Sequence, residues 1–459
     1  MQTLHPDWTL VDGQFAQGVG VQITPEGPLG PLLPPDAIPD SAVRLPGRAL
    51  LPGCINAHSH AFQRAIRGIT HLRTGSSGDD FWSWREAMYR VVERIDRDGI
   101  RALSRLAFLE MVRSGYTGVG EFHYIHHDPA CPGAPNGLAE AVIEAAQEVG
   151  IRIRLLRVAY ERSGFTGAPP SPGQLRFIEP DAQTIQDRTD ALASWCGSLG
   201  DPRVTTGIAP HSVRAVSGET LEALSDWAAA GEHVLHVHGS EQPAEVRDCL
   251  EATGLRPIAW LDERGALGPL TTVVHATHLD EDDIRRLARS GATVCACPTT
   301  EADLGDGILP AGPLHDSGVP FALGSDSQAV IDPFQEMRLL EMNERLRTGS
   351  RACLLDGAGT CAPVLLDAIT RGGARSLRWN AGAIVEGALA DLITVDLKDI
   401  RLAGALPETL PAMLACHGDG GLVRDVWTQG ERIVTDGAHR LDAAAREDFE
   451  QCLARIRGA

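Results

Sequence analysis

The chain has 459 residues, of which 43% are hydrophobic and 22% are charged, a composition typical of a globular protein with one large domain or two smaller ones. Its formal net charge of −20 argues against nucleic acid or an anionic membrane surface as the main partner. No apolar run reaches the roughly eighteen residues of a membrane span, and the start, MQTLHPDWTLVDG, lacks the features of a signal peptide, so we expect a cytoplasmic protein.

Strand-like runs broken by Gly and Pro occupy the first part of the chain and return near its end, in GALADLITVDL and VRDVWTQGERIVTDG. Between them, runs rich in Val, Ile and Thr alternate with longer amphipathic stretches, which is typical of βα units around a parallel sheet. Eight such runs follow one another: ALLPGCINAHSH, TGVGEFHYI, IRIRLLRVAY, VTTGIAPHS, HVLHVHGSE, TTVVHATH, ATVCACPTT and VPFALGSDS. We therefore predict an α/β fold with a (β/α)8 TIM-type barrel over residues 51–379.

Polar residues directly follow several of these runs, and the C-terminal ends of barrel strands meet on one face. His58 and His60 lie two residues apart, so they point to the same side of a strand; His238 closes the fifth run, and Asp326 follows the eighth. His236 is a weaker candidate because it lies deeper in its run. Taken singly, these residues have simpler interpretations, such as a helix cap for Asp326. Together, three imidazoles and one carboxylate suit a zinc ion at an open catalytic site.

Glu241 and His275 remain as acid–base groups on the same face. Glu241 follows His238 by three residues, and His275 ends the sixth run. Zinc lowers the pKa of its bound water from about 15.7 to roughly 7. Hydrolysis of a C=N bond then needs groups that orient the water and carry a proton to the leaving nitrogen. Glu241, His275 and Asp326 are our candidates for these catalytic roles, and the sequence leaves open which of them takes the first proton.

This pattern resembles the amidohydrolase superfamily, in particular its deaminase branch with one metal. That branch holds its metal on an HxH pair, a strand-5 His and a strand-8 Asp, which implies one Zn²⁺ on His58, His60, His238 and Asp326. Branches with two metals use a carboxylated Lys on strand 4, and the run VTTGIAPHSV has no Lys. The resemblance also implies a composite β-sandwich domain from residues 1–50 and 380–435, which leaves residues 436–459 as a C-terminal helical tail.

Within that branch, several segments are similar to the formimidoylglutamate deiminases of histidine degradation, namely INAHSHAFQRAIRG, DFWSWREAMY, GEFHYIHHD, APHSVRAV and HGSEQ. The resemblance implies that the substrate, N-formimino-L-glutamate, is held by Gln63, Arg85, Tyr124, His211 and Arg214. The planar fork of arginine suits its two carboxylates, and we expect Arg85 and Arg214 in loops on the catalytic face. The implied reaction is hydrolysis to N-formyl-L-glutamate and ammonia.

Two alternatives stay open. Another one-metal deaminase, acting on an amidine or an aminoheterocycle, would keep every metal residue and differ in the arginines and the FWSWR segment. A metal-free relative that retained the barrel as a scaffold would be expected to have lost ligands. As partners we expect a small molecule with two carboxylates and a second copy of the chain in a homodimer, with neither nucleic acid nor membrane. We expect Cys295 and Cys297 to be buried, reduced thiols rather than a zinc site.

Overall fold

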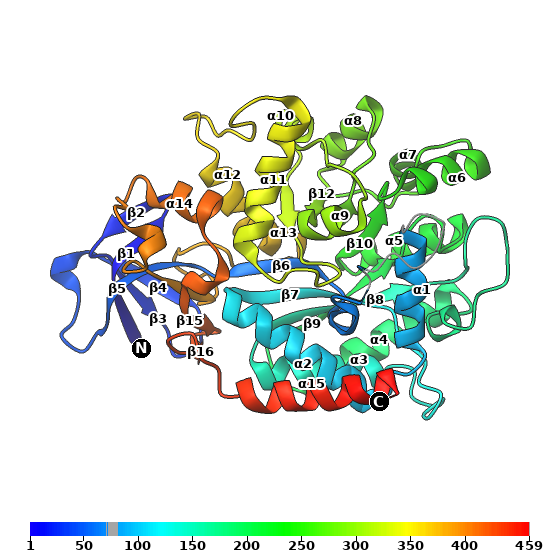
Figure 1. Cartoon of the computed structure of the whole chain (residues 1–459), viewed down its shortest axis with the longest axis horizontal. Helices are drawn as coiled ribbons and strands as arrows, with labels where there is room; N and C mark the ends of the chain where they lie inside the picture. The colour runs from blue at the N-terminus through cyan, green and yellow to red at the C-terminus, as the bar shows by residue number, and fades with distance from the viewer. Residues whose placement is uncertain (70, 72–80, 459) are drawn as a thin grey trace.

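Eight parallel strands, separated along the chain by helices, form a nearly closed barrel (Figure 1). These strands are β6 (Cys54–Ser59), β7 (Tyr116–His123), β8 (Arg152–Ala159), β9 (Val204–Pro210), β10 (Leu235–Gly239), β11 (Thr271–His275), β12 (Thr293–Ala296) and β13 (Phe321–Leu323). The computed structural model describes residues 1–69, 71 and 81–458, apart from the side chains of residues 81–83. Each strand overlaps one of the eight runs seen in the sequence, so the predicted barrel is confirmed.

The barrel closes where its last strand meets its first. A parallel bridge between Ser59 and Asp326 joins the end of β6 to the residues that follow β13. Every residue of β6, β7 and β10 is buried, as expected for a parallel sheet whose inner face is packed and whose outer face is covered by helices. The C-terminal ends of the strands therefore share one face, on which polar side chains can meet.

Helices surround the barrel, and several begin at acidic capping residues. Asp96 accepts a hydrogen bond from Gly99 N at 2.7 Å at the start of α2, and Asp280 and Asp283 form a capping box at the start of α8. The helices are α1 (Phe81–Val92), α2 (Arg97–Ser114), α3 (Gly137–Val149), α4 (Ala182–Ser198), α5 (Gly218–Ala230), α6 (Pro243–Thr253), α7 (Pro257–Glu263), α8 (Glu281–Ser290), α9 (Pro298–Leu304), α10 (Ala311–Asp316), α11 (Pro333–Thr348), α12 (Ala362–Asp367), α13 (Gly373–Ser376), α14 (Leu410–His417) and α15 (Asp442–Arg457). None of those in the described part of the chain combines the length and apolarity of a membrane span.

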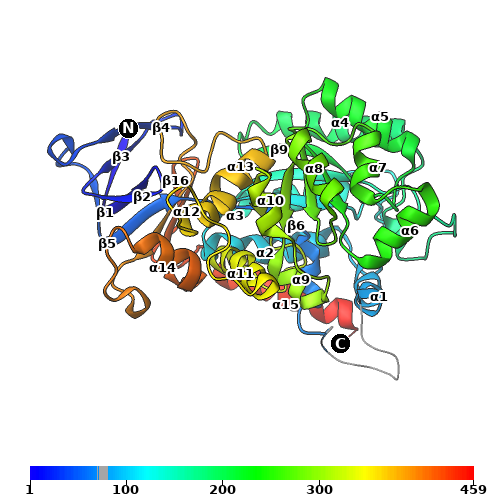
Figure 2. The ribbon, with the colours of Figure 1, turned by 90° about the horizontal axis from the view of Figure 1, so that it is seen from above.

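Strands from both ends of the chain form a second sheet beside the barrel (Figure 2). They are β1 (Gln2–Val11), β2 (Gln14–Gln17), β3 (Gly20–Ile23), β4 (Leu29–Leu33), β5 (Val43–Pro52), β14 (Leu392–Asp396), β15 (Val423–Thr428) and β16 (Glu431–Val434). The order is β16-β15-β14-β5-β1-β3-β4, with β2 paired to β1. The pairing is mixed, since β5 runs parallel to β1 and antiparallel to β14. As predicted, both ends of the chain build this smaller unit, and its strands form one mixed sheet.

A buried ion pair connects the second sheet to the barrel. Arg152 on β8 donates to both carboxylate oxygens of Asp391, at 2.6 Å and 3.0 Å, and Asp391 also accepts from Gln429 N at 2.7 Å. The carbonyl of Asp391 in turn accepts from Gly53 N, between β5 and β6. Near the chain's end, α15 packs against α2 along the barrel (Figure 1). These contacts hold the chain ends against the strands that carry the site described next.

Candidate active site

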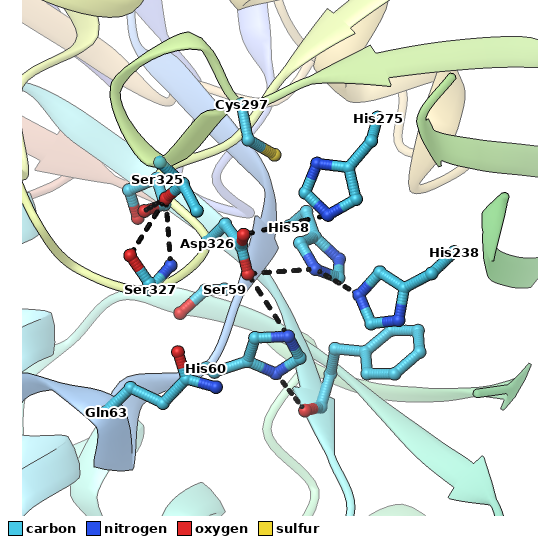
Figure 3. A network of polar contacts seen from close by, with 12 residues as sticks. His58, Ser59, His60, Gln63, His238, His275, Cys297, Ser325, Asp326 and Ser327 are labelled. Atoms are coloured by element: carbon cyan, nitrogen blue, oxygen red, sulfur yellow. Dashed lines mark hydrogen bonds and ion pairs between the residues drawn. The ribbon is translucent and has the colours of Figure 1, made fainter. Parts of the chain in front are cut away.

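Four side chains from three barrel strands meet at the C-terminal end of the barrel. His58 lies on β6 and His60 just after it, His238 lies on β10, and Asp326 follows β13. His58 Nε2 lies 3.0 Å from His238 Nε2 and 3.4 Å from Asp326 Oδ1, and His60 Nε2 lies 3.2 Å from the same oxygen. One donor atom from each residue lies within 4.8 Å of the others, and all four residues are buried. Figure 3 shows the imidazoles of His58 and His60 directed toward Asp326 and that of His238 directed toward His58.

Main-chain carbonyls orient two of these imidazoles. His60 Nδ1 lies 2.9 Å from the carbonyl oxygen of Phe122, and His238 Nδ1 lies 2.9 Å from that of His211. A proton donated from Nδ1 leaves Nε2 as the free ring nitrogen. Burial lowers the pKa of His58 to about 3 and that of His238 well below 6.5, which keeps both rings in the neutral form that binds metals. Three imidazole nitrogens and one carboxylate oxygen around one point fit a zinc-type ion.

His275, at the end of β11, lies beside this cluster and contacts three carboxylates. Its Nε2 lies 3.7 Å from Glu241 Oε1 and 3.7 Å from Asp326 Oδ2, while its Nδ1 lies 3.4 Å from Glu301 Oε1. Burial lowers the pKa of His275, but the three carboxylates together raise it well above 6.5. The sequence analysis predicted His275, Glu241 and Asp326 as neighbours, and the structure brings them together. It missed Glu301, although this residue follows the seventh run, a strand end to which we assigned no functional group.

The main chain adopts positive φ angles where the barrel strands end in the site. His275 has a φ of 70°, Ala276 one of 55° and Asp326 one of 43°, values that cost a non-glycine residue about 1–3 kcal/mol each. A hydrogen bond of 3.0 Å from Ala276 N to the carbonyl of Gly239 holds the end of β11 against β10. The surrounding barrel therefore fixes the directions from which His275 and Asp326 enter the site.

The five residues predicted to hold the substrate line one cavity together with the acid–base residues and three of the four candidate metal ligands, His60, His238 and Asp326. The five predicted residues are Gln63, Arg85, Tyr124, His211 and Arg214. The sequence analysis did not identify the aromatic wall that completes this cavity, formed by Trp84, Tyr89, Tyr160 and Phe177. Trp84 and Tyr89 belong to the quoted DFWSWREAMY segment, and Tyr160 ends the third run, so their positions carried a signal. A neighbouring cavity of about 560 Å³ shares Arg85, Arg214 and Glu241.

Two polar groups in the cavity wall have atoms without a protein partner. Gln63 Nε2 donates to the hydroxyl of Tyr124 at 2.9 Å, which leaves the buried Gln63 Oε1 without a hydrogen bond among the described residues. Arg214 Nη1 is also buried and has no such partner. An unpaired buried donor or acceptor is costly, by about 1–3 kcal/mol, so both atoms are suited to a bound molecule that supplies an acceptor and a donor.

Arg85 differs from the expectation in one respect. We predicted a loop position for it, but it lies on helix α1, which begins at Phe81 and contains most of the DFWSWREAMY segment. Its guanidinium lies 5.7 Å from the centre of the Tyr89 ring, a cation–π distance. Asp80 and the side chains of Phe81, Trp82 and Ser83, part of the same quoted segment, lie outside the described residues.

A comparison with protein families agrees with this arrangement. The profile of the amidohydrolase family matches residues 49–433, which include the whole barrel and every residue of the site. The chain belongs to the amidohydrolase family. The resemblance inferred from the strand-end residues is therefore confirmed, and the chain is a hydrolytic enzyme.

Individual amidohydrolases extend the comparison. The formimidoylglutamate deiminase of Pseudomonas aeruginosa is 37% identical over 461 residues, which cover 99% of this chain and 100% of that protein. The crystal structure of an amidohydrolase from Brucella melitensis has a TM-score of 0.91 and 29% identity, with 100% of both chains covered. An adenosine deaminase from Xanthomonas campestris with bound zinc has a TM-score of 0.84 and 25% identity, covering 100% of this chain and 99% of that one.

Proposed function

We propose that this amidohydrolase is a zinc-dependent formimidoylglutamate deiminase. It adds water to the formimino carbon of N-formimino-L-glutamate and releases N-formyl-L-glutamate and ammonia, a step of histidine degradation. The relative that is 37% identical over its full length supports this substrate by its name. The observation that carries the proposal is the unpaired, buried Arg214 Nη1 in the wall of the cavity that contains the acid–base residues.

The cavity complements this substrate in charge and hydrogen bonding. Arg85 and Arg214 each pair with one carboxylate, which a guanidinium binds through two parallel hydrogen bonds. The free Gln63 Oε1 accepts an N–H of the substrate, and the ring of His211 supports the same end. These two arginines place two positive charges in the cavity wall although the chain as a whole carries a net charge of −20.

The residues around the cluster divide the chemistry among them. A zinc ion held by His58, His60, His238 and Asp326 supplies a Lewis acid that makes water nucleophilic at neutral pH. Asp326 Oδ2 accepts the proton that the attacking water loses, and the protonated His275 Nε2, 3.7 Å from that oxygen, donates a hydrogen bond that orients the water during this transfer. Glu241 carries a proton through Oε1 to the leaving nitrogen, so that the tetrahedral carbon expels ammonia. Burial of the cluster excludes other water from the reacting carbon.

A second candidate function is the deamination of an aminoheterocycle. The aromatic wall of Trp84, Tyr89, Tyr160 and Phe177 favours it, because aromatic rings stack on flat bases, and the similar Xanthomonas structure is named an adenosine deaminase. Such a base carries no carboxylate, so it would leave the buried Arg214 Nη1 without a charged acceptor. For this reason the proposal favours the dianionic substrate.

An ammonia-release assay separates these functions. The purified, zinc-loaded protein is incubated with N-formimino-L-glutamate, N-formimino-L-aspartate, guanine, cytosine and adenosine. We expect the highest kcat/KM for N-formimino-L-glutamate. A higher value for any neutral base would overturn the proposed substrate and leave a one-metal deaminase of another specificity. No turnover of any compound, together with no bound metal, would point to the scaffold alternative.

A further inference from the structure

We infer that Glu301 is a positioning residue, whose carboxylate holds the imidazole of His275 in its working orientation. This inference rests on the proposed function, because it assigns His275 a part in the proton transfers of that reaction. Glu301 belongs to α9, the short helix that follows β12, and lies far from His275 in the sequence. Only the barrel brings the two residues into contact.

The contact is buried and specific. Glu301 is 2% exposed, and its Oε1 lies 3.4 Å from His275 Nδ1. The same oxygen accepts a hydrogen bond of 2.8 Å from Cys297 N, which fixes the carboxylate at the start of α9. Among the described residues, Glu301 is the hydrogen-bond partner of His275 Nδ1. The carboxylate is therefore held by the main chain on one side and faces the ring on the other.

This contact determines which ring nitrogen is available to the substrate. A proton on Nδ1 that is donated to Glu301 leaves Nε2 directed at Glu241 and Asp326, each 3.7 Å away. The main-chain conformation at His275 fixes the direction of its Cβ. It does not fix the rotation of the imidazole about the bond from Cβ to the ring, so either ring nitrogen could face the cavity. Without an acceptor beside Nδ1, the ring would be free to rotate away from this orientation.

A different interpretation of the same cluster is a second metal site. One donor atom each of His275, Cys297 and Glu301 lies within 4.8 Å of the other two. Burial raises the pKa of the Cys297 thiol well above 9, and Cys295, Asp326 and Glu301 raise it further, so the thiolate that a metal needs is costly here. Because Glu301 Oε1 already accepts from Cys297 N, the geometry favours positioning. The experiment below includes the metal count that distinguishes the two.

The test compares Glu301→Met, which fills the same space without an acceptor, with Glu301→Gln, which keeps one. The matched control is Glu336→Met. Glu336 is also buried and binds the start of the same helix, accepting from Thr299 N at 3.1 Å, but it does not contact His275. We expect Glu301→Met to lower kcat by roughly 10- to 100-fold, the usual effect of removing a partner that orients a functional histidine. Its KM and its metal content should stay within about twofold of wild type.

Glu301→Gln should recover most of the lost kcat, and Glu336→Met should stay within about fivefold of wild type. Glu301→Ala replaces the Met variant if the latter does not fold. The inference is wrong if Glu301→Met is as active as Glu336→Met, or if Glu301→Gln does not recover kcat. It is also wrong if wild type binds a second metal that both Cys297→Ala and Glu301→Met lose. Failure of wild type to hydrolyse N-formimino-L-glutamate contradicts the proposed function instead, and the same variants are then compared on the substrate that the ammonia assay identifies.

Discussion

Asp326 is joined to His58 through both its main chain and its side chain. Its amide N donates to the carbonyl of His58 at 3.0 Å, and its Oδ1 lies 3.4 Å from His58 Nε2. The carbonyl of Asp326 also accepts from His60 N at 2.9 Å. The contacts that close the barrel therefore also bring the candidate ligands together.

The four candidate ligands predict how many metal ions each chain binds. We expect about one zinc-type ion per chain and loss of turnover after chelation, with little change in the far-UV circular dichroism spectrum. His58→Ala, His60→Ala or His238→Ala should remove the metal and abolish activity. His236→Ala is the matched control, because His236 lies on the same strand but its Nε2 bonds to the carbonyl of Ser376 at 3.1 Å. Elemental analysis of two tightly bound ions, or metal loss from the control alone, would contradict the assignment.

Glu241→Gln should keep the metal and lose activity by a factor on the order of 10²–10⁴, because an amide cannot carry the proton that the leaving nitrogen needs. Glu245→Gln serves as its control. Glu245 lines the neighbouring cavity, as Glu241 also does, and accepts from Glu241 N at 3.0 Å, a bond that the amide oxygen of Gln preserves. Metal analysis and kcat are measured for both. If Glu241→Gln lost its metal and regained turnover on reloading, Glu241 would be a ligand.

Arg85→Met and Arg214→Met should retain the metal and the fold but lose substrate recognition. Each change removes hydrogen bonds to a charged group, and each such bond contributes about 1.5–3 kcal/mol. Since about 1.4 kcal/mol corresponds to a factor of ten, kcat/KM should fall at least tenfold. Replacing the matching substrate carboxylate by an amide should lower kcat/KM strongly for wild type. For that amide substrate, the arginine change should lower kcat/KM much less than it does for the natural substrate. Equal losses for both substrates would indicate a general loss of positive potential.

The pair of Arg152 and Asp391 should matter for stability and not for chemistry. Both side chains are 3% exposed, so Asp391→Asn leaves a buried cation without its charged partner, at a cost of about 3–5 kcal/mol. The exposed pair of Arg446 and Glu450 lies at 2.8 Å, and Glu450→Gln should cost about 1 kcal/mol or less. Thermal or denaturant unfolding measures both. Unchanged stability of the Asp391 variant would show that the link between sheet and barrel contributes little.

Local patterns were enough to predict the barrel and the residues that it brings together at the candidate metal site. The eight runs are short, apolar and separated by amphipathic stretches, and each pattern depends only on neighbouring residues. His58 and His60 share a face because side chains alternate along a strand, and the parallel barrel brings every strand end to one side. His238, His275 and Asp326 could be placed in the site by the same reasoning.

Tertiary structure decided the features that depend on residues far apart in the sequence. Glu301 contacts His275 only because α9 turns back toward β11, and no spacing in the chain reports that turn. The partner of His236 was decided in the same way, because its Nε2 bonds to the carbonyl of Ser376, 140 residues further along the chain. Arg214 Nη1 is buried without a hydrogen-bond partner among the described residues, and Arg85 lies on a helix, because side-chain surroundings follow from packing. Periodicity determines which residues face the site, and packing determines which atoms in it remain unpaired for a substrate.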